Sequence, residues 1–411
     1  MFRTPLPPYV STGEREVEAA LRVLRTGTLS DFIGAPGPRF DGGHEVRRLE
    51  EEWAAYFGVR HAISVNSGTS GLHAAVVAAG ARAGDEVIVP PMTMSATATA
   101  VVMAGATPVF VDVEESTCCI DPARVAAAIT AKTRAIIAVN LFGGPAPVQE
   151  LRRLADDHGI VLIEDNAQAA AGRSQGALLG TVGHVAVFSL NCHKTIQCGE
   201  GGVVVTDDDR LARRVRLVRN HGENVIEAQG WHDDSDIVGF NYRLTEPQAA
   251  IARVQLDRLE ELTAPRIEIA TALGDALRRF PGLRVAAVAA GDRHVFYVFP
   301  LWVDASTIGM SKDSFAAAMA AEGAPVAARY VRPLYRLPLF VELIASGRAA
   351  VRESGQRCAV AERTWSDTLC YTTLIQVPGG AALVSTFAEA VERILEHASD
   401  IAAITDKEVS A

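Results

Sequence analysis

Long apolar runs are missing from this 411-residue sequence: no uninterrupted stretch of about 18 to 20 apolar residues occurs, so we expect no membrane-spanning helix. The N-terminal segment also lacks the apolar core of a secretion signal, and we therefore expect a cytoplasmic protein. A basic excess is missing as well, since 39 Lys and Arg residues against 49 Asp and Glu residues give a net charge of -10. This balance argues against nucleic acid or an anionic membrane as a partner and leaves a small-molecule ligand open.

Cysteines in the paired CxxC spacing of a zinc site are also absent, although the sequence has six cysteines. We therefore expect no metal site, and we expect free, buried thiols, as is usual in a reducing compartment. Internal repeats and low-complexity segments are not found. With 49% hydrophobic residues, the chain can bury an extensive core and form more than one domain.

Strands and helices alternate from residue 61 onward. Short β-branched runs such as HAISV, DEVIVP and PVFVDV are each followed by a helical pattern. That rhythm indicates βαβ units and a largely parallel sheet covered on both faces. A long helical pattern over residues 246–280 follows, and beyond it strands lie among helices in a different order, which predicts a smaller α+β domain.

Two segments outside this rhythm have their own signals. Ser11 and Glu14 stand in capping-box spacing, which predicts an opening helix that ends at Gly27. The apolar positions of this helix are Val17, Leu21 and Leu24. The acidic segment 231–236 is expected to form a solvated loop.

The segments VNSGTSGL and LIEDNAQ both follow apolar strands and carry candidate ligand groups. In the first, backbone N–H groups at a helix start form an anion site, and Gly68 allows a phosphate to approach closely; an ordinary N-cap is the alternative. In the second, Asp165 ends its strand at the edge of the sheet where ligands bind in open α/β folds. Its carboxylate can pair with a protonated ring nitrogen or cap the next helix.

The segment FSLNCHKTIQCGEGG places Ser189 and Lys194 between an apolar strand and a glycine-rich turn. Partial burial lowers the pKa of such a lysine and leaves a free amine that attacks an aldehyde, whereas a surface or salt-bridged lysine is the alternative. The occurrence of these segments together, in one order on one sheet, favours a lysine that attacks an aldehyde. A phosphate anchor, an acidic strand end and an imine-forming lysine are the parts that an electron-sink cofactor requires.

These segments, in this order with LSDF, GGHEVRRLEEEW, PPMTMSATA, RNHGEN, GFNYRLTEPQAA and VRPLYRLPLF, resemble the DegT/StrS-type sugar aminotransferases, which are fold-type-I pyridoxal-phosphate enzymes. The resemblance covers most of the chain. It implies an α/β fold with a large domain (residues 1–258), whose mostly parallel seven-stranded sheet lies between helices, and a small C-terminal α+β domain (residues 259–411). It also implies a homodimer with shared active sites.

The same resemblance implies individual roles at the site. Lys194 is the imine-forming lysine and general acid/base, Asp165 pairs with the pyridine nitrogen, and Gln168 sits beside the ring and its 3-oxygen. Met94 stands where the family usually has an aromatic ring, and its polarizable sulfur can still cover the cofactor. The residues implied to hold the phosphate are Gly68, Thr69, Ser70 and Ser189, with Asn241 from the neighbouring subunit. The residues implied near the substrate are Arg219, His221 and Tyr335, for which ordinary interface packing is the alternative.

The implied function is a pyridoxal-phosphate-dependent aminotransferase that moves an amino group from glutamate or glutamine to a keto-sugar or an inosose-like keto-cyclitol. Pyridoxamine phosphate carries the amino group between the half-reactions, and the pathway is amino sugar or aminocyclitol antibiotic biosynthesis. One alternative is a sugar dehydratase or deoxygenase of the same fold; some of these carry histidine in place of the lysine, so the presence of Lys194 counts against it. The other is a non-catalytic cofactor-binding regulator, which would be expected to lose Lys194 or to gain a DNA-binding segment.

Overall fold

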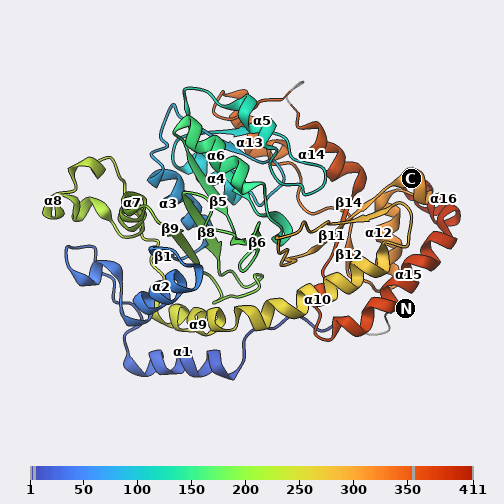
Figure 1. Cartoon of the computed structure of the whole chain (residues 1–411), viewed down its shortest axis with the longest axis horizontal. Coiled ribbons are helices and arrows are strands. Elements are labelled where there is room, and N and C mark those ends of the chain that lie inside the picture. The colour runs from blue at the N-terminus through green and yellow to red at the C-terminus, as the bar shows by residue number, and fades with distance from the viewer. Residues whose placement is uncertain (1, 3–5, 354–356, 410–411) are drawn as a thin grey trace.

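An eight-stranded sheet forms the centre of the larger part of the protein (Figure 1). The computed structural model describes residues 2, 6–353 and 357–409. Neighbouring strands of this sheet are parallel except at β9, which runs antiparallel to both of its neighbours. In spatial order the strands are β1 (His61–Val65), β9 (Gly202–Thr206), β8 (Val185–Ser189), β5 (Val161–Asp165), β4 (Thr133–Val139), β2 (Glu86–Val89), β3 (Thr107–Phe110) and β13 (Ala350–Val351).

Seven of these strands come from residues 61–206, so the predicted α/β fold with a mostly parallel sheet is confirmed. The predicted number of seven strands needs a correction. The eighth strand, β13, belongs to the C-terminal part of the chain and pairs in parallel with β3, where Ala350 lies opposite Val109. A two-residue strand gives no alternating pattern in the sequence, which explains why it was not expected.

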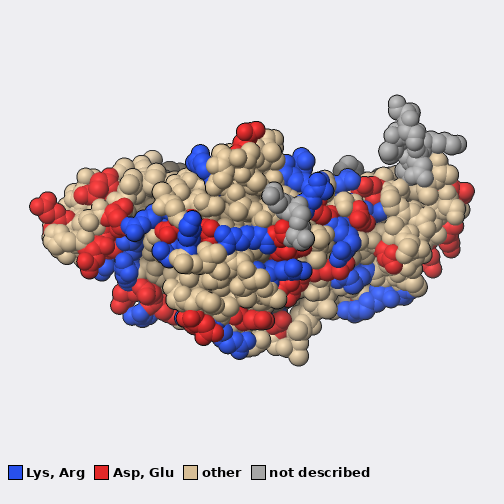
Figure 2. Space-filling model, turned by 90° about the horizontal axis from the view of Figure 1, so that it is seen from above, with Lys and Arg blue, Asp and Glu red and all other residues tan. Residues whose placement is uncertain are grey.

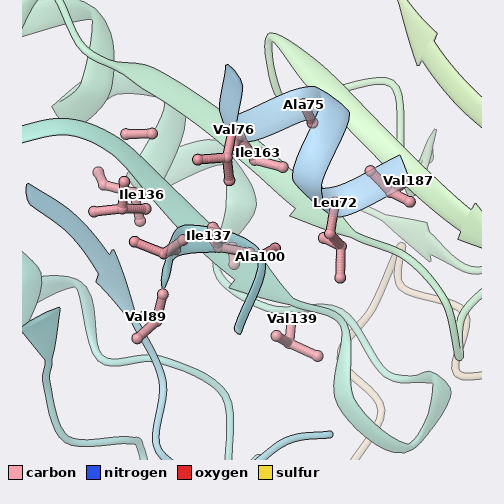
Figure 3. Close-up of a cluster of buried hydrophobic side chains, with 14 of the residues drawn as sticks. Leu72, Ala75, Val76, Val89, Ala100, Ile136, Ile137, Val139, Ile163 and Val187 are labelled. Carbon is pink, nitrogen blue, oxygen red and sulfur yellow. The ribbon is translucent and has the colours of Figure 1, made fainter. Parts of the chain in front are cut away.

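Helices cover both faces of the sheet because successive side chains of its strands point to opposite sides. On one face Val187 of β8 packs with Leu72 and Val76 of helix α3. Part of this core is drawn in Figure 3. Phe188, the next residue, packs with Trp53 on the other face. The helices around the sheet are α2 (His44–Phe57), α3 (Gly68–Ala78), α4 (Ala96–Met103), α5 (Pro122–Ala128), α6 (Val148–His158), α7 (Asp209–Arg219), α8 (Ile226–Gln229) and α9 (Glu246–Asp257).

A second, four-stranded antiparallel sheet lies at the opposite end of the molecule, with the chain termini beside it in Figure 1. Its strands, in spatial order, are β10 (Leu283–Val285), β11 (Phe299–Val303), β14 (Leu369–Thr372) and β12 (Val326–Ala327). A separate core forms between this sheet and its helices, with Leu273, Phe315 and Phe387 at its centre. The remaining helices and strands are α10 (Leu259–Leu277), α11 (Ala305–Ile308), α12 (Lys312–Ala321), α13 (Pro338–Ala345), α14 (Ala359–Arg363), α15 (Val384–Glu396), α16 (Ala398–Val409), β6 (Arg173–Ser174) and β7 (Ala177–Leu178).

The connection between the two sheets runs along α9 and α10 rather than along the single long helix expected over residues 246–280. The helix breaks at Arg258, whose backbone departs from helical angles with φ -97° and ψ 5°. Beyond α12 the chain returns to the large sheet, where Phe340 of α13 packs edge-on against Phe110 of β3. The division into domains at residues 258 and 259 therefore stays a prediction.

The opening helix α1 (Glu14–Thr26) starts two residues later than the Ser11 cap predicts. Gly13 is the N-cap, and its N–H donates to the carboxylate of Glu16 at 2.8 Å. The prediction of a helix ending at Gly27 is confirmed, because Gly27 adopts the left-handed conformation with φ 76°. Capping by Ser11 was wrong because the chain is still extended where Ser11 lies buried between the helix and α9.

The apolar stripe of α1 faces outward. Val17, Leu21 and Leu24 are 49%, 41% and 51% exposed. The helix instead buries the small side chain of Ala19, together with Val23, against α9. Helical spacing of apolar residues predicts that a face will be covered, but it does not say by which part of the molecule or by which chain.

The acidic segment 231–236 is not a fully solvated loop as expected. Asp234 is fully buried and accepts hydrogen bonds from Arg213 at 2.6 Å and Arg214 at 3.0 Å. The expectation was wrong for Asp234 because two arginines of α7 lie beneath the segment and pair with it. Elsewhere charged side chains of both signs are interspersed, as Figure 2 shows for the face seen from above.

Five of the six cysteines are buried free thiols, as predicted, and Cys192 is exposed. The described residues contain no group of three or more His, Cys, Asp or Glu side chains that could hold a metal ion. In the same described part of the chain, no helix has the length and apolar character needed to cross a membrane.

Candidate active site

A cavity of about 340 Å³ opens at the carboxyl ends of the central strands, where ligands bind in open α/β sheets. Strands β1, β4, β5 and β8 all point their C-terminal ends toward it, so that short loops after each strand supply its walls. The lining includes seven of the predicted site residues, namely Gly68, Thr69, Met94, Asp165, Gln168, Ser189 and Lys194. Segments far apart in the sequence therefore meet in one place.

Asp165 ends β5 in the floor of the cavity and is 5% exposed. Thr97 donates a hydrogen bond of 2.8 Å to its Oδ2, and the backbone N–H of Ala167 donates one of 3.2 Å to its Oδ1. Burial raises the pKa of this carboxyl group, and the Thr97 bond, the Ala167 bond and the charge of Lys194 oppose the rise. A buried carboxylate held in this way is stabilised by a cation placed against it.

Lys194 extends from the loop between β8 and β9 into the same cavity. Its Nζ lies 4.6 Å from the centroid of the Tyr297 ring, and no hydrogen bond from Nζ is found within the described part of the chain. Burial lowers the pKa of the amine, and the negative charge of Asp165 raises it by less. Lys194 is therefore neutral at a lower pH than an exposed lysine, which is the condition for nucleophilic attack on a carbonyl.

The start of α3 forms the end of the cavity nearest to Ser189. The Ser67 hydroxyl caps the helix by accepting from the N–H of Ser70 at 3.0 Å. A side chain at Gly68 would place its Cβ 2.9 Å from the Cβ of Ser189, so glycine keeps this space open. The first N–H groups of a helix have no partner within the helix and attract anions. These observations fit a phosphate group.

Gln168 is fixed at both ends of its side-chain amide. Its Oε1 accepts a 2.8 Å hydrogen bond from the N–H of Phe142, and its Nε2 donates a 2.9 Å bond to the Tyr330 hydroxyl. Phe142 and Tyr330 also meet edge to face, with ring centroids 5.1 Å apart. The amide plane is thus held rigidly against the cavity wall.

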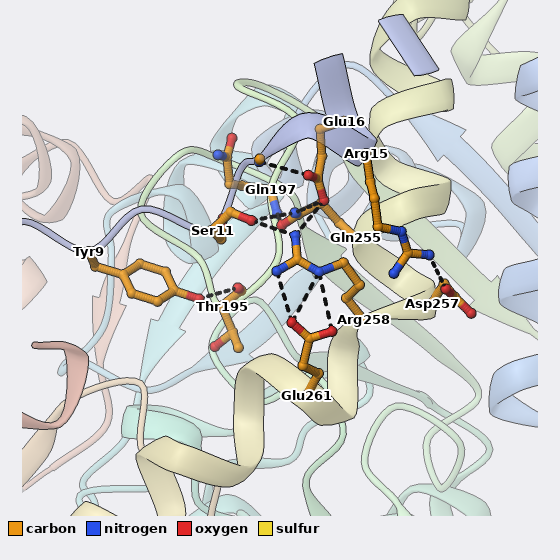
Figure 4. Close-up of polar contacts among 11 residues, drawn as sticks. Tyr9, Ser11, Arg15, Glu16, Thr195, Gln197, Gln255, Asp257, Arg258 and Glu261 are labelled. Atoms are coloured by element: carbon orange, nitrogen blue, oxygen red, sulfur yellow. Dashed lines mark hydrogen bonds and ion pairs between the residues drawn. The ribbon is translucent and has the colours of Figure 1, made fainter. Parts of the chain in front are cut away.

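The loop that carries Lys194 is tied to the N-terminal segment (Figure 4). The Tyr9 hydroxyl donates to the carbonyl of Thr195 at 2.9 Å, directly after the lysine. The amide oxygen of Gln255 accepts from the N–H of Gln197 at 3.2 Å, and its nitrogen donates to the Ser11 carbonyl at 3.0 Å. The guanidinium of Arg266 lies 4.3 Å from the centroid of the Tyr9 ring and holds that ring in place.

Replacing Tyr9 with phenylalanine is expected to loosen the lysine loop without unfolding the protein. The lost hydrogen bond is worth about 0.5–1.5 kcal/mol, so amide hydrogen exchange over residues 191–200 should accelerate by roughly 2- to 10-fold. Tyr56→Phe is the matched control, because its hydroxyl bonds Glu260 on the surface. Equal exchange in this loop for both variants would show that Tyr9 does not restrain it.

Ser70, Arg219 and Tyr335 do not line the cavity. The Ser70 hydroxyl is directed to the Asn66 amide oxygen at 2.6 Å. Arg219 is completely buried and pairs with Glu50 at 2.6 Å and Asp41 at 3.0 Å.

Tyr335 is buried against Phe110, and its hydroxyl donates to Glu362 at 2.6 Å. Within this chain the contacts of Ser70, Arg219 and Tyr335 are structural. A place near the substrate stays a prediction for Arg219 and Tyr335.

His221 and Asn241 also lie outside this cavity, near the surface. His221 adopts a left-handed backbone with φ 53°, and its Nδ1 is 3.7 Å from the Glu223 carboxylate. Asn241 is exposed, and its backbone carbonyl accepts from the side-chain amide of Asn66 at 3.4 Å. Among the described residues no hydrogen bond of its side chain is found.

Three residues of the site were not anticipated from the sequence. Thr97 holds Asp165, Tyr297 lies against Lys194, and Tyr330 bonds Gln168. The position of Thr97 in α4, directly after the Met94 loop, was a usable signal, because a helix start after a parallel strand faces the ligand edge. The two tyrosines flank strands of the second sheet, Tyr297 just before β11 and Tyr330 just after β12, and no local pattern indicates that they reach the cavity.

Comparison with known proteins agrees with this geometry. The sequence model of the DegT/DnrJ/EryC1/StrS aminotransferase family matches residues 35–371. The chain is 31% identical to DesV of S. venezuelae, over 96% of this chain and 99% of DesV, with a TM-score of 0.78. It is 29% identical to 3-amino-5-hydroxybenzoic acid synthase, over 94% and 99% of the two chains, with a TM-score of 0.80. GDP-4-keto-6-deoxymannose-3-dehydratase, 22% identical over 94% and 100%, shares the fold with a TM-score of 0.77.

Proposed function

Since this chain belongs to the DegT/DnrJ/EryC1/StrS aminotransferase family, whose cofactor is pyridoxal 5'-phosphate, we propose that it transfers an amino group from glutamate or glutamine to a keto-sugar or keto-cyclitol. One observation carries the proposal: a partly buried lysine and a buried aspartate face one cavity whose third side is the start of a helix. We place the reaction in amino sugar or aminocyclitol antibiotic biosynthesis. We also propose a cytoplasmic location, which the five buried free thiols support.

The residues present fit the cofactor. The carboxylate of Asp165, which burial destabilises, suits a protonated ring nitrogen. The start of α3 with Gly68, Thr69 and Ser189 suits the phosphate, and Met94 lines the same cavity at a place from which it can cover the ring. When bound, pyridoxal phosphate supplies an electron-withdrawing ring that accepts the negative charge left at the donor's Cα.

Proton movement at the donor is assigned to Lys194. Its Nζ can take the Cα proton of the amino acid and return a proton to the acceptor in the second half-reaction, because burial lowers the pKa of the amine. With the cofactor bound, the carboxylate of Asp165 would lie against the ring cation and would keep a proton on the ring nitrogen. Tyr297 and Tyr330 narrow the cavity and exclude water from it.

The polar groups in the lining support a hydroxyl-rich acceptor. Asn191, His193 and Glu200 line the cavity and provide donors and acceptors suited to ring hydroxyls. Asn191 already donates to Glu200 at 2.9 Å, and hydroxyls of a sugar or a cyclitol can join this pair, which an apolar ketone cannot do. A panel of keto-sugars and inososes, assayed with glutamate and with glutamine for aminated product by mass spectrometry, tests the proposal. No aminated product from any acceptor would refute it.

A dehydratase or deoxygenase remains the second candidate. The 22% identical dehydratase shows the fold alone, and the presence of Lys194 favours transamination. The same assay separates the two, because elimination removes water from the acceptor and leaves no nitrogen in the product. A non-catalytic regulator would give neither product.

We further propose a homodimer in which Asn241 reaches the phosphate of the partner subunit. An apolar strip supports this proposal, because Leu21 and Leu24 of α1 are exposed together with Leu29 and Ile33 of the following loop. That loop lies near the segments on both sides of Asn241, since a Cβ added at Gly34 would come within 4 Å of Arg243, His221 and Asn224. Exposed apolar side chains next to a free amide are what a shared interface requires.

Mixing two inactive variants, Lys194→Ala and Asn241→Ala, under conditions of subunit exchange is expected to restore activity above that of either parent. Each mixed dimer then holds one site with both residues. Asn241→Ala alone should weaken cofactor retention by about 10- to 100-fold, because an amide bond to a charged group is worth about 1.5–3 kcal/mol. A failure to complement after proven exchange would mean that Asn241 serves its own chain.

Disrupting the apolar strip tests the interface independently. Leu24→Glu should shift the protein to monomers in sedimentation velocity, because burying an unpaired carboxylate is costly. Leu339→Glu is the matched control, since Leu339 is equally exposed, at 50% against 51%, but lies on α13 outside the strip. A monomeric wild-type protein would remove the basis of both experiments and of the shared site.

A further inference from the structure

A second cavity lies behind the wall of the active site and has no role in the proposed reaction. Its volume is about 140 Å³. Its walls are largely apolar and come from Leu141, Phe142, Pro145, Ala286, Ala287, Val288, Pro300 and Trp302. Ser116, Thr117 and Asp292 add polar groups to the lining. An apolar cavity of about 150 Å³ in another protein holds one benzene molecule, so this one has room for a single small ring.

His294 supplies a free hydrogen-bond donor to this cavity. The side chain is 7% exposed, and its Nδ1 accepts a 3.0 Å bond from the N–H of Phe296, which places the ring proton on Nε2. No acceptor for the Nε2 proton is found in the parts of the chain that the structure describes. Burial lowers the pKa of the imidazole to about 3, so His294 is a neutral donor at physiological pH. A buried donor without an acceptor costs free energy that a ligand oxygen recovers.

The cavity and the active site share one strained turn. Phe142 lines the cavity and adopts a left-handed backbone with φ 59°, which is unusual for a bulky residue. Its N–H holds the amide oxygen of Gln168 in the active site, and its carbonyl accepts from the N–H of Tyr297 at 2.7 Å. Next to it, the Gly143 carbonyl accepts from the N–H of Val295 at 2.9 Å. One turn therefore touches the cavity on one side and positions Gln168 and Tyr297 on the other.

We propose that this cavity is a second ligand site, which takes a small uncharged ring compound with a single acceptor oxygen bound to Nε2 of His294, and that its occupancy stabilises the Phe142 turn. The apolar walls disfavour a polyhydroxylated ring, which distinguishes this ligand from the acceptor of the proposed reaction. The carboxylate of Asp292 disfavours anions. The site does not depend on which ketone the enzyme aminates.

Cyclohexanone and methylenecyclohexane form the probe pair, because they have the same shape and only the ketone accepts a hydrogen bond. Ligand-observed NMR on the full-length protein should show cyclohexanone binding about 2- to 10-fold tighter, the range that one net hydrogen bond gives. In His294→Phe the preference for the ketone should fall, and only the donors left in the lining, such as the indole N–H of Trp302, could still favour it. This comparison is made within one variant, so any change in packing affects both probes alike. A preference for the ketone that is undiminished in His294→Phe would overturn the role of the imidazole.

A variant that fills the cavity distinguishes probe binding in the cavity from probe binding elsewhere on the protein. Ala287 is an exposed residue of the lining, and Ala287→Trp should abolish binding of both probes. Ala290→Trp is the matched control, since Ala290 is also exposed and does not line the cavity. Binding that survives Ala287→Trp, or that is absent from the wild type, would overturn the site.

The link to the active site has a separate readout. Saturating cyclohexanone should slow amide hydrogen exchange at Phe142 by at least about 3-fold in the wild type and leave it unchanged in Ala287→Trp. Exchange is measured without substrates, so the result does not depend on the proposed aminotransferase activity. Binding without slower exchange at Phe142 would overturn the coupling.

Discussion

Replacing Lys194 with alanine is expected to abolish turnover, with a loss of about 10,000-fold or more, together with the covalent bond to the cofactor. The reason is its position: Lys194 brings an amine into the cavity beside Asp165, and burial lowers the pKa of that amine. The measurement is borohydride reduction of the wild-type holoenzyme followed by peptide mapping. The reduced cofactor should be attached to the peptide that contains Lys194 and be missing in Lys194→Ala.

Few lysines compete for the cofactor in this experiment, because the sequence has four: Lys132, Lys194, Lys312 and Lys407. Lys132 is exposed, so Lys132→Ala serves as a control that should keep the reducible bond. Lys312 is buried, donates to the carbonyl of Ala328 at 2.6 Å and does not line the cavity. A reduced cofactor found on any lysine other than Lys194 would refute the assignment.

Much of this site could be predicted because its parts follow strand ends. Gly68, Asp165 and Ser189 each stand directly after or at the end of a buried β-branched run, and the ends of parallel strands meet at one edge of a sheet. The order of the runs alone therefore brings these residues together. Lys194 could be placed at the same edge because it lies five residues after Ser189, the last residue of β8.

Side chains contributed by other layers could not be predicted in this way. Tyr297 lies just before β11 and Tyr330 just after β12, so both come from segments beside the second sheet, and α9 and α10 bring that sheet next to the cavity. For Arg219 the family resemblance implied a place near the substrate, and within this chain Glu50 and Asp41 pair with its guanidinium in the core. Local patterns describe which residues are polar, and the tertiary partners decide whether they are free.

The N-terminal helix shows the same limit for packing. The spacing of Val17, Leu21 and Leu24 correctly indicated a helix with an apolar face, and in the isolated chain that face is exposed. The pattern is thus explained if a second copy of the chain covers it, which is the proposed interface. A sequence pattern for burial refers to the assembled protein and not to one chain.

Changing Asp165 to asparagine is expected to cost about 100- to 1,000-fold in kcat while the fold is retained. Asparagine preserves the shape and can still accept the hydrogen bond of the Ala167 N–H at Oδ1. Its Nδ2 then donates to the Thr97 hydroxyl, which can turn to accept, and the amide carries no charge to hold a proton on the ring nitrogen. Thr97→Val is the matched comparison. It removes the hydroxyl that lowers the pKa of Asp165 and leaves the carboxylate in place, so its loss of rate should be much smaller.

A second readout of Asp165→Asn follows from the charge that it removes. The negative charge of Asp165 raises the pKa of Lys194 against the larger effect of burial, so its loss should lower the pKa of Lys194 further. Free of cofactor, the variant should therefore react with a small aldehyde at Lys194 down to a lower pH than the wild type, as followed by borohydride trapping and peptide mapping across a pH series. The direction of the pKa shift decides between the two explanations. A variant that merely loosened the site would expose Lys194 to water and move its pKa upward toward that of a free lysine. An unchanged or upward shift, or near-normal kcat, would show that Asp165 does not act electrostatically on this cavity.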